Sequence, residues 1–292
     1  MLRSNITCAL AILSFAIGFP ALEILLNDWG FVSVVLVRNI IAFILILSIW
    51  ILKEGFETIS LVSWSRGFMV GAIGYGFGSV LLVITQVLTT TFTAAFAAAL
   101  MPLAAIFLEI LLDKRRITKK FILGLTLVII GSIVILEKTL TNVKFNLGLI
   151  IGLLAVTFFA WGSRATVKYL PEISILARTS ITTLGMVGFS FLIYLFCMSF
   201  KLGATSIPQI KIEYIYLFII YAGFGLAISQ ILWIKSVSEL GIGLASFHLN
   251  INPFYVMLIL FLIGYEWNWL QAAGAIVVIS GITITQINFN KS

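Results

Sequence analysis

Long hydrophobic runs recur from one end of this 292-residue sequence to the other. Each run is long enough to cross a hydrocarbon layer about 30 Å thick as an α-helix. Because 61% of the residues are hydrophobic and only 10% are charged, a water-soluble fold could not cover this much apolar surface. The sequence therefore predicts an all-α integral membrane protein with ten transmembrane helices, at roughly 6–26, 31–52, 67–85, 91–112, 121–137, 147–167, 175–198, 214–234, 242–264 and 269–287.

The segments between these runs are short. The longest, near 53–66 and 199–213, hold about 15 residues, too few for a soluble catalytic or nucleic-acid-binding domain. The first run follows Arg3 as a signal peptide would, but it has the length of a span, and we expect it to be retained. Cys8 and Cys197 lie in different runs, which favours two free buried thiols over a disulfide or a metal site.

Positive charge is unequally divided between the two sides of the predicted membrane. With the N-terminus placed inside, twelve of the 18 Lys and Arg residues fall on the inner side and four on the outer side, while Arg38 and Arg178 lie within runs. This asymmetry follows the positive-inside rule and places both termini in the cytoplasm. The basic cluster at 113–120 is then interpreted as a topology anchor.

The chain contains a weak internal repeat. The segment "AAFAAALMP" at 94–102 aligns with "ASFHLNINP" at 245–253 at an offset of 151. Each half, 1–138 and 145–288, holds five runs, and because five is odd the second half enters the membrane from the opposite face. We therefore expect two inverted five-helix repeats. The paired landmarks are Pro102 with Pro253, Gly18 with Gly162, Arg38 with Arg178, Tyr75 with Leu226, Gly124 with Gly274 and Gly131 with Gly281.

Several motifs together resemble EamA-type members of the drug/metabolite transporter superfamily. They include "FAWGSRATVKYL" at 159–170, "GYEWNWLQAAGAIVVISGI" at 264–282, arginines that open the second and seventh runs, and a proline in the fourth and ninth. Two positions depart from the family: Arg115 stands where the first half would carry the counterpart of Glu266, and Ile17 precedes Gly18 where a Trp-Gly pair is expected. The resemblance implies an exporter or exchanger of amino acids, other metabolites or drugs in a bacterial cytoplasmic (inner) membrane.

The ninth run carries polar side chains. His248, Asn252 and Tyr255 are spaced at i, i+4 and i+7 and so share one face of a helix, with Asn250 to the side. Because polar groups facing lipid are costly, we expect this stripe to face the protein interior. There it either contacts substrate or makes hydrogen bonds between helices. His248 has two open roles, proton coupling and a structural one.

Pro253 and its counterpart Pro102 are candidate hinges. Each proline removes one helical hydrogen bond and frees a carbonyl one turn earlier. Two symmetric kinks are what both halves need if they bend to open and close a central pathway. A static packing kink is the alternative.

Further candidates for a central cavity lie on the first, third, sixth and eighth runs, which the resembled family places around it. Their aromatic residues could form walls for an aromatic or ammonium group, or merely pack. Glu23 and Arg38 reach a similar depth and are expected to form an ion pair, the alternative being that Glu23 receives a cation or a proton. The lining candidates are Phe15, Phe19, Phe158, Trp161, Tyr75, Ser79 and Gln230.

These features favour a secondary transporter that exports or exchanges small metabolites by alternating access around a midplane cavity. Neutral polar groups and aromatics fit neutral or aromatic amino acids or related zwitterions. Organic cations, quaternary amines or drugs are the alternative substrates. A membrane-embedded enzyme is a weaker alternative, because no paired carboxylates, nucleophile with a base or metal constellation is evident. A passive channel or assembly scaffold is a further weaker alternative. No Walker-type glycine loop is present, so we expect that ATP is not the direct energy source. We expect no cofactor, no metal and no nucleic-acid partner. The expected partners are substrate and lipid, with the chain a monomer or a homodimer.

Overall fold

The fold is known from a computed structural model that describes residues 2–113, 119, 122–127, 130 and 143–286. All regular structure in these ranges is helical, which confirms an all-α chain. The helices are α1 (Leu2–Leu25), α2 (Phe31–Glu54), α3 (Trp64–Val70), α4 (Phe77–Leu88), α5 (Thr91–Ala99), α6 (Met101–Asp113), α8 (Val143–Tyr169), α9 (Ile175–Ser199), α10 (Ile212–Phe218), α11 (Ser229–Phe247), α12 (Asn252–Leu262) and α13 (Trp269–Gln286).

Short helical elements of other types join or interrupt them. Two are π-helical, η2 (Gly71–Gly76) and η4 (Ile219–Ile228). Three are 3₁₀ turns, η1 (Phe56–Leu61), η3 (Gly203–Thr205) and η5 (His248–Ile251). The π segments continue helices on both sides, so α3, η2 and α4 form one rod, as do α10, η4 and α11.

Seven stretches of the described chain are long and apolar enough to cross a membrane. They coincide with predicted runs, and the last, Ile212–Leu262, holds 51 residues. A straight helix of that length would extend about 76 Å, more than twice the thickness of a hydrocarbon core. Gly241 interrupts it with a φ of 79°, a backbone conformation that favours glycine. The basic cluster at 113–120 and the fifth run at 121–137 lie largely outside the described residues.

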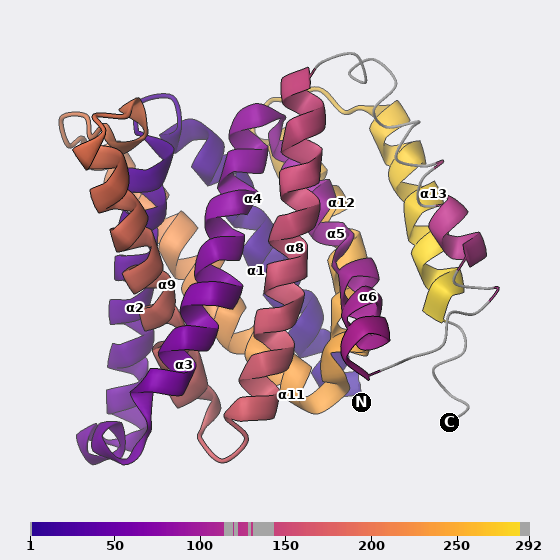
Figure 1. The fold of residues 1–292 in the computed structure, drawn as a ribbon. Helices are drawn as coiled ribbons and strands as arrows, with labels where there is room; N and C mark the ends of the chain where they lie inside the picture. The colour runs from indigo at the N-terminus through magenta and orange to yellow at the C-terminus, as the bar shows by residue number, and fades with distance from the viewer. Residues whose placement is uncertain (1, 114–118, 120–121, 128–129, 131–142, 287–292) are drawn as a thin grey trace.

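Helices from the two halves of the sequence interleave in one bundle (Figure 1). α2 packs against α9, α4 against α8, and α1 against both η4 and α11. α5, which ends three residues before Pro102, packs against α12, which contains Pro253. α2 and α9 lie at one edge of the bundle and α13 at the other.

Two backbone crossings hold this arrangement together. At one, Gly18 of α1 meets Gly225 of η4, and a Cβ built on Gly225 would lie 2.9 Å from the Cα of Gly18. At the other, Gly74 of η2 meets Gly162 of α8, where a Cβ on Gly74 would lie 2.5 Å from the Cα of Gly162. Only glycine permits such close contact between helices. Both crossings fall within a π-helical segment.

Apolar clusters pack at both ends of the bundle. The cluster toward the N-terminus joins α1, α6, α8 and α11 and includes Ile12, Met101 and Trp233. The opposite cluster joins the end of α1 to α2, α4 and α10, with the Trp29 ring 5.1 Å from that of Phe218 and 5.8 Å from that of Tyr214. Each cluster therefore joins helices from both halves of the sequence.

Candidate functional site

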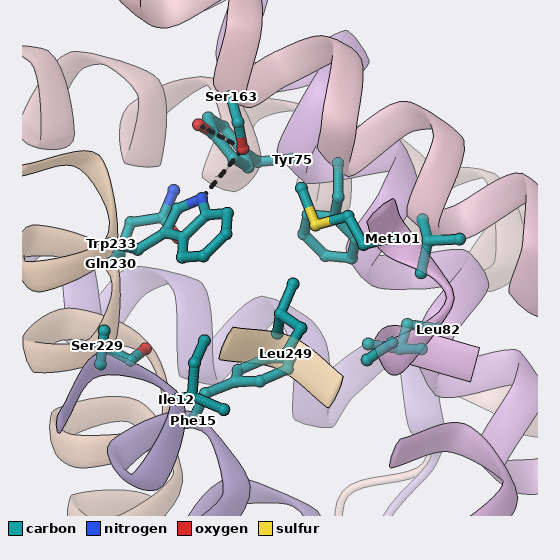
Figure 2. A pocket seen from close by; sticks show the side chains of 14 residues that line it. Ile12, Phe15, Tyr75, Leu82, Met101, Ser163, Ser229, Gln230, Trp233 and Leu249 are labelled. Carbon is teal, nitrogen blue, oxygen red and sulfur yellow. Dashed lines mark hydrogen bonds between the residues drawn. The ribbon is translucent and has the colours of Figure 1, made fainter. Parts of the chain in front are cut away.

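A cavity lies at the centre of the bundle between α1, the α3–η2–α4 rod, α8 and α11. Its volume, measured as the space open to the centre of a water molecule, is about 60 Å³. Figure 2 shows mostly apolar side chains around it, with a group of polar atoms at one edge. The lining residues are Ala11, Ile12, Phe15, Tyr75, Leu82, Ala98, Met101, Val156, Phe159, Ser163, Ser229, Gln230, Trp233 and Leu249.

The polar edge of this first cavity is centred on Ser163 of α8. Its Oγ accepts a hydrogen bond from Trp233 Nε1 at 2.9 Å and another from the Tyr75 hydroxyl at 3.4 Å (Figure 2). Thr166, one turn along α8, donates to the Tyr75 hydroxyl at 3.4 Å. Three different rods thus meet through hydrogen bonds between side chains. These bonds fix the orientation of two aromatic walls.

A second cavity adjoins the first and shares part of its wall. Its volume, measured in the same way, is about 50 Å³. The shared residues are Phe15, Leu82, Phe159, Ser229 and Gln230. Gln230 is 8% exposed and its Nε2 has no hydrogen-bond partner in the described protein. An amide at the boundary between the two cavities is therefore available to a ligand in either.

The second cavity contains a charged side chain, Arg38 of α2. The Asn39 side-chain oxygen accepts from Arg38 Nε at 3.1 Å and from Nη2 at 2.9 Å. The Tyr221 hydroxyl accepts from Nη1 at 2.9 Å, and the guanidinium carbon lies 4.9 Å from the centre of the Tyr221 ring. The expected ion pair between Glu23 and Arg38 is not formed.

Glu23 instead belongs to a network toward the surface. The Thr91 hydroxyl donates to its carboxylate, and the Tyr265 hydroxyl donates to it at 3.5 Å. Gln86 Nε2 donates to Thr91 Oγ1 at 2.9 Å and to the Phe19 carbonyl at 3.0 Å. The negative charge of Glu23 raises the pKa of the Tyr265 phenol above its usual value, so this phenol stays a hydrogen-bond donor. Sequence depth placed Glu23 and Arg38 together, but their helix faces direct them to different partners.

Gln86 connects this network to the interior. It lines the second cavity and also a surface cavity bordered by Glu23, Asp28 and Thr91. Gln86 is 6% exposed, and its Oε1 has no partner in the described protein. The residue thus stands between the inner cavity and the surface at the α1–α2 loop end.

The cavities bring together some of the residues predicted from the sequence. Phe15, Tyr75 and Gln230 line the first, and Phe15, Phe19, Ser79, Gln230 and Arg38 line the second. The Phe15 and Phe19 rings meet edge to face at 5.0 Å. Phe158 and Trp161 are outside both linings; Phe158 packs on Phe77 at 4.6 Å, and Trp161 packs against the cluster near the N-terminus.

The polar stripe of the ninth run lies beside the cavities and outside their linings. Asn252 donates to the Ala95 carbonyl of α5 at 3.1 Å, which ties α12 to the first half. Buried His248 Nδ1, Asn250 Oδ1 and Asn252 Oδ1 have no partner in the described protein. Tyr255 packs with two apolar clusters, and Leu249 is the residue of this segment that lines the first cavity. A role for the stripe in substrate binding stays a prediction.

Both predicted hinges lie at helix interruptions. α5 ends at Ala99 and α6 begins at Met101, so Pro102 is in the first turn of a new helix. Pro253 is in the first turn of α12, directly after the 3₁₀ turn η5. Proline is tolerated there because the first amides of a helix have no intrahelical partner. A hinge role for both stays a prediction.

Several lining residues were missed from the sequence, chiefly Ser163, Trp233, Met101 and Phe159. Ser163 directly follows Gly162, and Trp233 is one helical turn after Gln230, so both could have been found from the residues already selected. Within the described ranges, no group of His, Cys, Asp and Glu side chains is arranged to hold a metal ion.

Comparison with known proteins gives a family and a fold. Residues 2–137 match the model of the EamA-like transporter family, which is part of the drug/metabolite transporter superfamily. A crystal structure, described only as that of a protein, shares the fold with a TM-score of 0.73, covering 99% of each chain at 14% sequence identity. No curated protein matches the chain significantly.

Proposed function

We propose, from the premise that this chain belongs to the EamA-like transporter family, that it is a secondary transporter that exports or exchanges small metabolites. The family match and the apolar helices make it an integral membrane transporter. The mechanism that we propose is alternating access, in which two halves rock about a midplane site and expose it to each side in turn.

Two inverted five-helix repeats, 1–138 and 145–288, form the architecture that we propose. The seven apolar stretches give ten spans if Ile212–Leu262 crosses twice and if α13 and the fifth predicted run cross once each. The repeat pairs Gly18 with Gly162 and, by the offset that pairs Tyr75 with Leu226, Gly74 with Gly225. If each glycine of the Gly18–Gly225 crossing is replaced by its repeat counterpart, the result is the Gly162–Gly74 crossing. The two π-helical segments also fall at corresponding positions.

The observation that carries the proposal is the pair of adjoining cavities beside these crossings, with walls built from helices of both halves. A channel would need a continuous open path, whereas a carrier needs a site that either end can uncover. An enzyme would need a nucleophile with a base, paired carboxylates or a metal among the lining groups. The lining offers amides, hydroxyls, aromatic rings and the guanidinium of Arg38. These bind and orient, and we propose no chemistry and no cofactor.

Neutral or aromatic amino acids, or related zwitterions, are the substrates that we propose. The aromatic walls suit an apolar side chain, and the free amides of Gln230 and Gln86 suit its polar end. Organic cations and quaternary amines are the second candidate because of the aromatic walls. Arg38 weighs against them, since a buried cation repels another.

The remaining features are proposed from the sequence. Both termini face the cytoplasm of a bacterium, the protein is in the inner membrane, and it works as a monomer or homodimer. Proton coupling through His248 or Glu23 is the alternative to a structural role for these two residues. Among the candidate substrate contacts, we favour the cavity-lining Phe15, Phe19, Tyr75, Ser79 and Gln230 over His248, Asn250, Asn252, Tyr255, Phe158 and Trp161.

Counterflow in liposomes tests the proposal. Purified protein is reconstituted and assayed with pooled labelled neutral amino acids, aromatic amino acids and quaternary amines against a trans excess of each. A carrier exchanges at least one pool, while a channel only equilibrates it. Gln230→Ala is expected to lower exchange, and His248→Ala/Asn252→Ala to retain it. The opposite result would place the site on the ninth run, and no exchange for any pool would count against this substrate range.

A further inference from the structure

The second cavity holds a buried positive charge that the described protein does not neutralise. Arg38 is 7% exposed. Its partners, Asn39 and Tyr221, are neutral, and no Asp or Glu of the described residues pairs with it. A buried guanidinium without an anion is costly, above all in a membrane span. An anion supplied from outside the protein would offset that cost.

The unused hydrogen-bonding groups around Arg38 are donors. A guanidinium has five N–H groups, and the bonds to Asn39 and Tyr221 leave one on Nη1 and one on Nη2. The Tyr221 hydroxyl accepts from Arg38 and keeps its own proton to donate. Gln230 Nε2, at the boundary of the same cavity, is also free. Donors that line one cavity beside a cation match an anionic oxygen pair.

We infer that the second cavity binds the carboxylate of the transported substrate, with Arg38 as its anchor and Tyr221 and Gln230 as further donors. The inference rests on the proposed transport function and narrows its substrate class to carboxylates. A carboxylate carries one negative charge and matches one arginine. A phosphate ester, which carries nearly two charges, would require a further cation, and none lines either cavity.

The rest of the substrate can be placed from the same walls. Gln86 Oε1 is an unpartnered acceptor in the second cavity and can receive an ammonium N–H. The first cavity continues past Phe15 and Phe159 into an apolar space between Ile12, Met101 and Leu249. A carboxylate at Arg38, an ammonium group at Gln86 and an apolar side chain in the first cavity describe an amino acid zwitterion.

The test uses pairs of probes that differ at the carboxylate: leucine with leucinamide, tryptophan with tryptophanamide, and betaine with choline. Each probe competes in counterflow against the labelled pool that the wild-type protein exchanges. Each probe is also tested for thermal stabilisation of the detergent-purified protein. We expect at least one carboxylate to be preferred over its partner by about tenfold, as befits a charge-assisted bidentate contact. Arg38→Gln should abolish the preference, and Arg38→Lys, which keeps the charge without the fork, should retain part of it.

Arg178→Gln is the matched control. Arg178 is the repeat counterpart of Arg38 and is also buried, but it donates to the Pro171 and Ile173 carbonyls and to Ser238 and lines neither cavity. This variant should keep the carboxylate preference even if it is less stable.

The outcomes separate the two proposals. Exchange in which amides and choline compete as well as the acids, or in which Arg38→Gln keeps the preference, overturns the anchor and leaves transport intact. If liposomes exchange no probe, transport of these compounds fails, and the stabilisation assay decides the anchor: absent or equal shifts for acid and amide overturn it. If Arg38→Gln does not fold, the anchor is tested by Arg38→Lys and by the preference of the wild-type protein for each acid over its amide or for betaine over choline.

Discussion

At the scale of single residues, the first cavity depends on one hydroxyl. Ser163 Oγ accepts hydrogen bonds from Trp233 and Tyr75, whose rings form two of the walls. Both donors are buried, at 8% and 1% exposure. Without this acceptor, two buried polar groups would lose a partner, although Tyr75 would keep its contact with Thr166.

Ser163→Ala should therefore destabilise the protein by roughly 1–3 kcal/mol, the cost of unsatisfied buried donors. It should also weaken substrate binding because the Trp233 indole is no longer held in place. Unfolding of the purified variant measures the first effect and the concentration dependence of exchange the second. Ser280→Ala is the control, since that exposed serine bonds only within its own helix. Equal stability of the two variants would contradict the role given to Ser163.

Residue partners were harder to predict than residue types. The sequence predicts Gln230 as a lining residue, and the structure leaves its Nε2 without a partner in the described protein, in the cavity wall. Glu23 and Arg38 were paired by depth alone, and depth does not tell which way each helix is rotated about its axis. Asn252 looked like a binding residue, yet its one described bond joins two helices.

At the scale of elements, the glycine crossings make the strongest demand on the sequence. A Cβ on Gly74 would lie 2.5 Å from a backbone atom of α8, so α3–η2–α4 and α8 could accommodate it only by moving apart. The third run carries Gly67, Gly71, Gly74 and Gly78, a spacing that permits close approach of another helix but does not tell which one approaches. The partner depends on how the halves interleave, which is a property of the whole bundle.

Gly74→Ala should cost roughly 1–3 kcal/mol through overpacking and should lower exchange, because Tyr75 and Ser163, the neighbours of this crossing, line the first cavity. Gly223→Ala is the matched control within a π segment: its Cβ would meet only Leu45 Cδ1, at 3.9 Å. That control should be neutral or slightly stabilising, as alanine is the better helix former. Thermal unfolding and counterflow of both variants provide the comparison, and equal behaviour would contradict the crossing as a constraint.

The interruption between α5 and α6 gives a second prediction at this scale. Pro102→Ala restores an N–H group and permits a continuous helix through Leu100. If the break is a hinge, exchange should slow severalfold while substrate binding and stability are preserved. Pro208→Ala, in the segment between η3 and α10, is a control for the substitution itself. Unchanged exchange in Pro102→Ala would make the break a static packing feature.

At the scale of the molecule, the sequence predicts orientation through its charges. Glu57 lies in η1, directly after the C-terminal end of α2. Gln209 lies in the segment after η3, and this segment is bonded to the other end of α2, because Gly30 N donates to the Ser206 carbonyl. The two exposed positions are thus at opposite ends of the bundle.

The membrane spans could be predicted from the sequence because the length and hydropathy of a run are local properties. The cavities could not be predicted in the same way, because their walls depend on which spans lie next to one another.

Glu57→Cys and Gln209→Cys test this orientation. In intact cells, a membrane-impermeant maleimide should label Gln209→Cys, and Glu57→Cys only after permeabilisation, since the positive-inside rule places the α2–α3 connection in the cytoplasm. Cys8 and Cys197 are buried, so the wild-type chain should remain unlabelled in the folded state. The reverse pattern would invert the protein in the membrane.

Each glycine crossing takes one glycine from either half of the chain, Gly18 with Gly225 and Gly74 with Gly162. Neither half can therefore complete a crossing from its own residues. A gene fragment that encodes one half would yield a protein lacking both contacts, while two fragments expressed together would restore them. Substitutions at these positions should accordingly arise in pairs that link the two halves, so that the chain evolves as one unit despite its internal repeat.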